Sequence, residues 1–204
     1  MIVIGIVGRP AAGKSTVARM LEAHGAVVLD ADRIAHAVLD EPEVRRAIGS
    51  RFGADVMDAR GRVRRSAIAA LVFGSTESHM AALESLEAII HPRVQRRIED
   101  RLAEIRAAGA DGGRVVVLDV PLLMQSGWDE FCDRLLVVEC DERERQRRMA
   151  ARGWSAEQRT ARERAWNRRY RSPDPKKTDR VDGSSGEAYT RIQVDRIWDS
   201  IRRN

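Results

Sequence analysis

The segment that most constrains this chain is a glycine-bounded loop near its start. A short apolar run, Ile2–Val7, ends at Gly8, and after four further residues the loop reaches Gly13, Lys14 and Ser15. This spacing, placed between an expected strand and an amphipathic helical pattern, is that of a P-loop. In such a loop backbone N–H groups surround a phosphate at a helix N-terminus, whose dipole favours negative charge. The sequence therefore predicts nucleotide binding, rather than a glycine turn before a surface helix.

The residues of the loop have distinct expected roles. We expect the backbone N–H groups of residues 11–15 to face the phosphates and Lys14 to place its charge beside the β- and γ-phosphates. The Ser15 hydroxyl is expected to bind Mg²⁺. The predicted nucleotide contacts in the loop are Gly8, Ala11, Ala12, Gly13, Lys14, Ser15 and Thr16. A P-loop alone does not distinguish a kinase from a GTPase or an ATPase.

Length and composition narrow the class of protein. With 204 residues, 43% hydrophobic and 33% charged, we expect a soluble chain with one domain or one core plus an inserted subdomain. No apolar stretch approaches a membrane span and no basic region precedes the first one, so we expect a cytoplasmic protein without a membrane partner. The net charge is +5, but the arginines are interleaved with glutamates, which favours a solvated helical face over a nucleic-acid patch. Cys132 and Cys140 are expected to be buried thiols, because no metal-binding spacing surrounds them.

Strand-like runs separate helical patterns along the chain. They occur at Ile2–Val7, Ala26–Leu29, Val115–Val120 and Leu135–Glu139, with a weaker edge-strand candidate at 180–182. Nearly uniform apolar strands that alternate with helices are typical of a parallel sheet covered on both faces. We therefore predict an α/β fold with a parallel sheet of about five strands flanked by helices.

Two helical excursions interrupt this pattern. Residues 39–113 are too many for a simple crossover and contain one obvious turn, Asp58–Gly61, so we expect a helical, substrate-binding insertion. The nucleotide-binding core would then comprise residues 1–38 and 114–204. Within it, about 141–178 is rich in arginine and is expected to form a mobile helical lid. Residues 186–203 are expected to form the closing helix.

Carboxylates follow two of the expected strands. If the second strand stays extended, Asp30 and Asp32 point to one face beyond its carboxyl end, where open α/β sheets bind ligands. We expect Asp32 to take the proton of an attacking hydroxyl, because its strand should lie beside the P-loop strand. The competing interpretation makes both residues helix caps. Asp119, after the third strand, is either a magnesium-associated carboxylate or a strand-end residue that binds the backbone.

Two arginines of the expected lid are candidates for phosphate binding. Arg148 and Arg152 are four residues apart, so they share one face of a helix. A lid that closes over a phosphoryl group uses such a pair to neutralise developing charge. The alternative is an exposed pair in an arginine-rich helix.

The order of these motifs resembles the dephospho-CoA kinase family over nearly the whole chain. The resemblance rests on the P-loop, Asp30-Ala31-Asp32, His91-Pro92, Pro121-Leu122-Leu123 and Arg148-x-x-x-Arg152, and Arg65 also matches the pattern. It implies a P-loop NTPase fold and transfer of the γ-phosphoryl group of ATP to the ribose 3′-hydroxyl of dephospho-CoA, with Mg²⁺. It assigns Lys14 and Ser15 to ATP and magnesium, Asp32 to activation of the hydroxyl, and Arg148, with Arg152, to the lid over ATP. The acceptor contacts it implies are Asp30, Asp32, Arg65, His91, Pro92 and Leu122.

The chain departs from the family pattern at four places. The loop interior is Arg9-Pro-Ala-Ala12 instead of glycine-rich, and its proline has no N–H to donate. Gln125 stands where the family has glutamate, which keeps hydrogen bonding but loses the charge. Asn167 replaces a glutamine, and Gly183 replaces an asparagine in a segment that the resemblance places beside adenine.

Two other functions remain open at this point. One is a different P-loop kinase of the nucleoside or nucleotide class, which would share the loop and the lid. The other is a nucleotide-binding regulatory protein that has lost catalysis, which the departures at Gln125, Asn167 and Gly183 suggest. A GTPase is disfavoured, because the sequence contains no Asn-Lys-x-Asp motif for guanine.

Overall fold

The structure, a computed structural model, describes residues 1–72, 74, 76–108, 114–168 and 170–203. It divides into two compact units: a sheet unit, residues 1–30 with 106–204, and a helical unit, residues 31–105. The first boundary therefore lies at Asp30 instead of residue 38, because helix α2 (Ala31–Val38) belongs to the helical unit. Residue 113, at the other expected boundary, lies outside the described residues.

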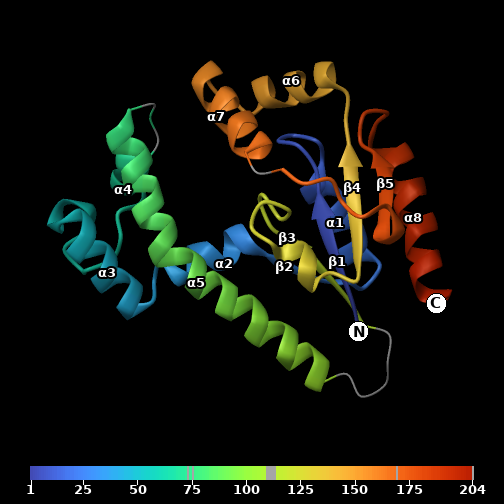
Figure 1. Cartoon of the computed structure of the whole chain (residues 1–204), viewed down its shortest axis with the longest axis horizontal. Coiled ribbons are helices and arrows are strands. Elements are labelled where there is room, and N and C mark those ends of the chain that lie inside the picture. Colours follow the sequence, from blue (N-terminus) through green and yellow to red (C-terminus); the bar gives the residue numbers. More distant parts are fainter. Residues whose placement is uncertain (73, 75, 109–113, 169, 204) are drawn as a thin grey trace. The chain divides into compact units, whose positions relative to one another are not determined.

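A parallel sheet organises the sheet unit (Figure 1). Its strands are β1 (Ile2–Val7), β2 (Val27–Asp30), β3 (Val115–Asp119), β4 (Arg134–Glu139) and β5 (Thr178–Asp182). Their order across the sheet is β2-β3-β1-β4-β5, and every neighbouring pair is parallel. The predicted fold class, an α/β protein with about five parallel strands, is confirmed. The weak candidate at 180–182 is a full strand that pairs with β4 along its whole length.

The strand order corrects one expectation about the second strand. Because β3 lies between β1 and β2, the strand that ends at Asp30 does not neighbour the P-loop strand. From β1 the chain passes through α1 (Lys14–Ala23) to β2 at the edge of the sheet. The strand between β1 and β2 is β3, which follows only after the helical unit. Strand order depends on such long-range crossovers, which local sequence patterns do not encode.

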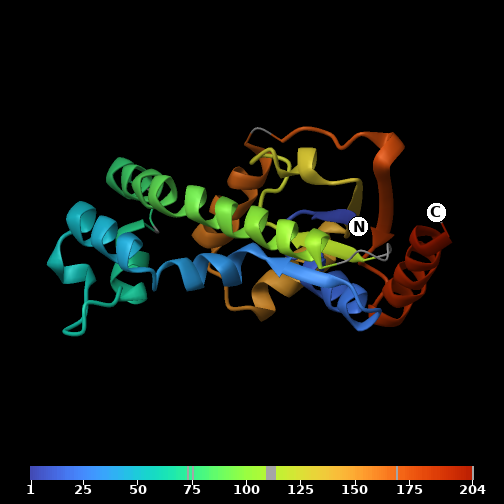
Figure 2. The same ribbon diagram turned by 90° about the horizontal axis from the view of Figure 1, so that it is seen from below.

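Helices α1 and α8 (Glu187–Arg203) cover one face of the sheet, and α8 also lies beside β5 (Figure 2). Alternate strand residues such as Ile4, Ile6 and Leu136 join one buried cluster with Leu21 of α1 and Val194 of α8. Each such side chain contributes about 1.5–3 kcal/mol when it leaves water. The predicted closing helix is confirmed, beginning one residue later than expected.

The excursion after β4 contains two helices, α6 (Glu142–Ala151) and α7 (Ala156–Asn167) (Figure 1). A capping box begins α7: the Ser155 hydroxyl accepts a hydrogen bond from the Gln158 N–H, while the Gln158 side chain accepts one from the Ser155 N–H. A short 3₁₀ turn, Pro175–Lys177, leads into β5. Another, Trp128–Phe131, precedes β4.

The helical unit consists of α2, α3 (Pro42–Phe52), α4 (Arg65–Val72) and most of α5 (Glu77–Ala107), with a 3₁₀ turn at Ala54–Val56. The expected turn at Asp58–Gly61 is present, because the Asp58 carboxylate accepts hydrogen bonds from two backbone N–H groups that follow it. Helix α5 is 31 residues long and buries a stripe spaced by three or four residues, Val94, Ile98, Leu102 and Ile105.

The two cysteines differ from each other. Cys132 is buried, and burial raises the pKa of its thiol to about 12, whereas Cys140 is only half-buried. The expectation of two buried thiols is therefore wrong for Cys140. Among the described residues, none of the helices combines the length and the apolar character needed to span a membrane.

Candidate active site

The P-loop connects β1 to the N-terminus of α1 and has a constrained backbone. Gly13 has φ 113°, and Ala11 has φ 62°, a left-handed conformation that is costly for a residue with a side chain. A Cβ at Gly8 would lie 2.8 Å from the Val138 carbonyl oxygen, so only glycine fits against β4. The loop thus has the conformation that its glycine spacing predicts. Contacts with neighbouring elements must stabilise the unfavourable backbone conformation of Ala11.

Lys14 begins α1 and turns its side chain back toward the loop. Its Nζ donates to the Gly8 carbonyl oxygen at 2.7 Å and to that of Arg9 at 3.4 Å. The same ammonium lies 6.0 Å from the centre of the Trp166 ring, at the limit of a cation–π contact. Trp166 belongs to α7 and is buried, so the excursion after β4 brings an aromatic side chain near the loop lysine. Sequence reasoning did not identify Trp166.

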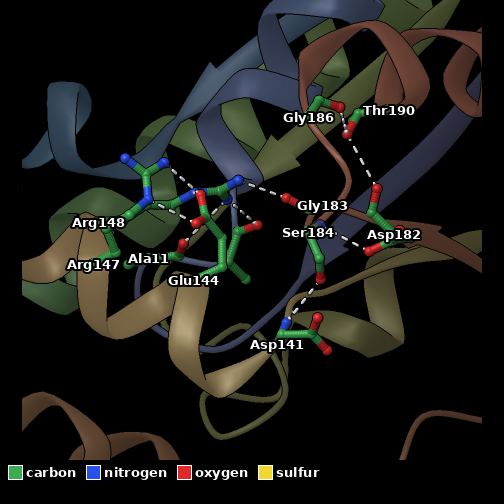
Figure 3. A network of polar contacts seen from close by, with 11 residues as sticks. Ala11, Asp141, Glu144, Arg147, Arg148, Asp182, Gly183, Ser184, Gly186 and Thr190 are labelled. Atoms are coloured by element: carbon green, nitrogen blue, oxygen red, sulfur yellow. Dashed lines mark hydrogen bonds and ion pairs between the residues drawn. The ribbon is translucent and has the colours of Figure 1, made fainter.

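Arg148 of α6 connects three segments of the sheet unit (Figure 3). Its Nη1 donates to the Ala12 carbonyl oxygen at 3.1 Å and to that of Ala11 at 3.5 Å, and its Nη2 donates to the Gly183 carbonyl oxygen at 2.6 Å. Its Nε donates to Glu144 at 2.8 Å. The guanidinium predicted to act in the lid is therefore seated against the P-loop.

Arg152 does not join Arg148 there. It caps the C-terminus of α6, and its guanidinium carbon lies 5.5 Å from the centre of the Trp154 ring. The helix ends at Ala151, but Arg152 keeps right-handed helical backbone angles and its N–H donates to the Arg148 carbonyl oxygen at 3.1 Å, so the predicted i, i+4 relation is present. The structure nevertheless separates the contacts of the two arginines.

The loop after β5 is held by its own polar groups. The Asp182 carboxylate accepts hydrogen bonds from the Ser185 hydroxyl at 2.6 Å and the Ser184 N–H at 2.7 Å, and these bonds lower its pKa. The Ser184 hydroxyl accepts a hydrogen bond from the Asp141 N–H, which ties this loop to the start of α6 (Figure 3). A Cβ at Gly183 would lie 2.5 Å from the Ala12 carbonyl oxygen. The departure at Gly183 therefore lets this loop approach the P-loop.

Asp30 and Asp119 end adjacent strands and are register partners in the parallel ladder. Asp32 does not share their setting. Helix α2 begins at Ala31, so Asp32 lies in the first helical turn, exposed and in the helical unit. The expected extended pair, Asp30 with Asp32, is wrong because the backbone turns directly from strand to helix. The partner of Asp30 on the same edge is Asp119.

The segment after β3 contains a second strained residue. Leu122 has φ 57°, and its carbonyl oxygen accepts hydrogen bonds from the N–H and the hydroxyl of Ser126, each at 3.0 Å. Gln125 follows, and its Nε2 donates to the Trp166 carbonyl oxygen. The Gln125 Oε1 is buried and has no hydrogen-bond partner among the described residues. The Gln125 amide thus holds the end of α7.

The other expected acceptor residues lie within the helical unit. Arg65 begins α4, donates to the His36 carbonyl oxygen at 3.4 Å and lies 3.9 Å from the Asp40 carboxylate. His91 and Pro92 are exposed on α5 and lie in its middle. Pro92 has no N–H for the carbonyl four residues earlier, yet the helix continues on both sides of it.

Comparisons with known proteins agree with this architecture. The family model described as dephospho-CoA kinase matches residues 2–171. A dephospho-CoA kinase of Rhodopirellula baltica is 39% identical over 170 residues, which cover 82% of this chain and 77% of that protein. A solved structure from Thermus thermophilus is 31% identical, with a TM-score of 0.72 and coverage of 98% of this chain and 96% of that one. The dephospho-CoA kinase of Campylobacter jejuni, 21% identical over 99% of this chain and 98% of its own, shares the fold with a TM-score of 0.66.

The matched region begins in β1 and includes the P-loop, the helical unit, β3, β4 and both helices of the excursion. It therefore covers the segments that carry the motifs described above. On the family model and the identity of its relatives, this chain belongs to the dephospho-CoA kinase family.

Proposed function

We propose that this chain transfers the γ-phosphoryl group of ATP to the ribose 3′-hydroxyl of dephospho-CoA. The reaction forms a bond between the 3′-oxygen and the γ-phosphorus, breaks the bond from that phosphorus to the β,γ-bridging oxygen, and releases ADP, CoA and the hydroxyl proton. The proposal rests on the Gly8–Ser15 loop, in which Lys14 Nζ donates to the Gly8 carbonyl oxygen. The chain that contains this loop matches the family over residues 2–171.

The sheet unit supplies the groups that hold ATP. Gly13 and its neighbours present backbone N–H groups at the N-terminus of α1, and Lys14 supplies a positive charge for the β- and γ-phosphates. We assign Arg148, whose guanidinium donates to a loop carbonyl, to neutralising charge on the nucleotide. The remaining proposed nucleotide contacts are Gly8, Ala11, Ala12, Ser15, Thr16 and Arg152.

The oxygen groups of the sheet unit suit Mg²⁺. The Ser15 hydroxyl lies in the first turn of α1, and the Asp30 and Asp119 carboxylates end neighbouring strands. Hydroxyl and carboxylate oxygens, together with phosphate oxygens and water, are the ligands that Mg²⁺ prefers. When bound, Mg²⁺ would neutralise negative charge on the phosphates.

The acceptor groups come mainly from the helical unit. We assign Asp32 to orienting the 3′-hydroxyl and accepting its proton, since it is an exposed carboxylate in the first turn of α2. Arg65, His91 and Pro92 of the same unit, with Asp30 and Leu122 of the sheet unit, are the remaining proposed acceptor contacts. Catalysis then rests on positioning and charge neutralisation.

Acceptor-dependent ADP formation tests this proposal. With purified chain and Mg²⁺-ATP, we expect ADP to form with dephospho-CoA and to stay near background with AMP or adenosine. Lys14→Ala should lose about three orders of magnitude in rate, because uncompensated charge in the transition state costs several kcal/mol. Glu22→Ala, exposed on the same helix, is the matched control and should keep its activity.

Each alternative has a distinct outcome in that assay. Turnover with adenosine or AMP, but not with dephospho-CoA, would make the chain a nucleoside or nucleotide kinase. ATP binding without ADP formation for any acceptor would make it a nucleotide-binding regulator. Both results would refute the proposed reaction.

A further inference from the structure

A buried arginine touches the phosphate-binding loop from outside the expected site. Arg145 of α6 has only 1% of its side chain exposed, although arginine is rarely buried without partners. Its Nη1 donates to the Pro10 carbonyl oxygen at 3.0 Å and to Glu163 of α7, and its Nη2 donates to Glu142. A single guanidinium therefore links the P-loop to both helices of the excursion.

Two arginines of α6 together hold consecutive carbonyls of the loop. Arg145 contacts the Pro10 oxygen, and Arg148, one turn later, contacts the oxygens of Ala11 and Ala12. These three residues belong to the interior of the loop, and Ala11 has the strained positive φ. Because its side chain penalises that conformation, the loop needs outside contacts to keep its path.

The direction of the peptide units connects these contacts to phosphate binding. In a trans peptide the C=O and the following N–H point in opposite directions, and the described chain contains no cis peptide bond. Hydrogen bonds that turn the Pro10 and Ala12 oxygens toward α6 therefore turn the N–H groups of Ala11 and Gly13 away from it. Those N–H groups are among the ones we assign to the phosphates.

A second ion pair extends the network to the first residue of the loop interior. Arg9 Nη2 lies 2.7 Å from Glu163 Oε2, while Glu163 Oε1 accepts the hydrogen bond from Arg145. Glu163 thus binds one arginine of the loop and one of α6. The side chain of Arg9 is 45% exposed, so we assign the main effect to the buried member, Arg145.

We infer that Arg145 is a positioning residue for the phosphates of ATP, acting through the Pro10 carbonyl and held in place by Glu163. It touches neither phosphate nor acceptor in this scheme. The inference deepens the proposed function, since it names a residue that sets the shape of the same site.

The test measures binding without any acceptor, so it does not depend on the identity of the substrate that receives the phosphoryl group. Isothermal titration calorimetry would give the dissociation constants of Mg²⁺-ATP and of inorganic tripolyphosphate for Arg145→Met. We expect both to rise about tenfold, because a hydrogen bond from a charged group to the loop is lost. Arg143→Met, exposed on the same helix, is the matched control and should stay within about twofold of wild type.

A purely structural role for Arg145 predicts a different result. Thermal unfolding would then shift, while the folded Arg145→Met protein would bind both ligands within about twofold of wild type, and that outcome would overturn the inference. Equal weakening in Arg143→Met would overturn it as well.

If Arg145→Met does not fold, Arg145→Lys and Glu163→Gln decide the matter. Lysine keeps the charge but lacks the planar fork that reaches the carbonyl and the carboxylate together. Glutamine keeps an acceptor but loses the charge that holds Arg145. We expect each to weaken binding of both ligands about threefold, and unchanged constants in both folded variants would contradict the inference.

Discussion

Asp30 and Asp119 stand side by side at the carboxyl ends of β2 and β3, as register partners in the parallel ladder. Register partners present their side chains to the same face of a sheet, so the two carboxylates share one edge. Asp30 belongs to a motif of the dephospho-CoA kinase resemblance, while Asp119 follows an apolar strand in the manner of a magnesium-associated carboxylate. The strand pairing brings the Asp30 and Asp119 carboxylates to the same edge of the sheet. These two carboxylates are the acidic ligands that we propose for Mg²⁺.

Asp119→Asn should therefore raise the Mg²⁺ concentration that gives half-maximal activity, by about tenfold, since a neutral amide is a weaker ligand for a hard cation. The measurement is a Mg²⁺ titration of ADP formation at saturating ATP. Asp199→Asn, exposed on α8, is the control and should titrate like wild type. An unchanged titration for Asp119→Asn would return Asp119 to a structural role at the strand end.

Asp32→Asn tests the proposed base. Asparagine keeps the shape but cannot take a proton, so kcat should fall by about 10²–10⁴ while the dissociation constant of Mg²⁺-ATP stays nearly the same. Steady-state kinetics with varied dephospho-CoA and calorimetry with ATP would separate the two effects. A normal kcat, or a defect confined to ATP binding, would remove Asp32 from proton transfer.

Gln125→Glu tests the amide that holds the end of α7. Its Nε2 donates to the Trp166 carbonyl oxygen, and a carboxylate at that place would set two acceptors against each other. We expect the free energy of unfolding to fall by about 1–3 kcal/mol. Gln125→Met removes the donor without adding charge and should cost less. Urea unfolding at neutral pH measures the free energy of unfolding of both variants. A Gln125→Glu protein as stable as wild type would show that the hydrogen bond from Gln125 to the Trp166 carbonyl oxygen does not contribute to stability.

Glu144 gives a prediction for acid conditions. Hydrogen bonds from Arg147, and next from Arg148, lower the pKa of its carboxyl to about 2, from an ordinary value of 4.5. A lowered pKa means that the folded state releases this proton more readily than the unfolded chain. The resulting stability is present above pH 4.5 and is lost progressively as the pH falls toward 2.

Urea unfolding of wild type and Glu144→Gln at several pH values measures this effect. Wild type should be the more stable at pH 7, and the difference should shrink below pH 4.5, because glutamine does not titrate. Glu157→Gln, exposed in the first turn of α7, is a comparison for a carboxylate whose pKa is lowered first by the hydrogen bond from the Ser155 hydroxyl instead of an arginine. A difference independent of pH would contradict the assignment to the ionised Glu144.

The local features of this chain could be predicted from its sequence because their signals are local. The glycine spacing of the P-loop and the apolar runs of β1, β3 and β4 each lie within a few neighbouring residues. The weak run at 180–182 became β5 because β4 offered a full edge for pairing, which the run itself does not reveal. The sequence Asp30-Ala31-Asp32 is compatible both with an extended strand end and with the start of a helix, and local pattern does not decide between them, whereas in the structure α2 begins at Ala31.

Features that depend on distant contacts escaped prediction. Arg145 reads as one more charged residue in an arginine-rich helix, and only its packing between the P-loop and Glu163 distinguishes it. Trp166 is near Lys14 because α7 folds back over the loop. In the sequence, Gly183 stands out only as a departure from the pattern of the resemblance. In the structure, its backbone lies so close to the Ala12 carbonyl oxygen that a side chain would not fit there.

The position of the transferred phosphoryl group decides whether this chain converts dephospho-CoA to CoA. After incubation of the chain with Mg²⁺-ATP and dephospho-CoA, the nucleotide product would be isolated and examined by phosphorus NMR and mass spectrometry. We expect a product identical to CoA, with one new phosphomonoester on the ribose 3′-oxygen and one ADP formed for each product molecule. A phosphoryl group at any other position, or ADP released with inorganic phosphate and unchanged dephospho-CoA, would contradict the proposed reaction.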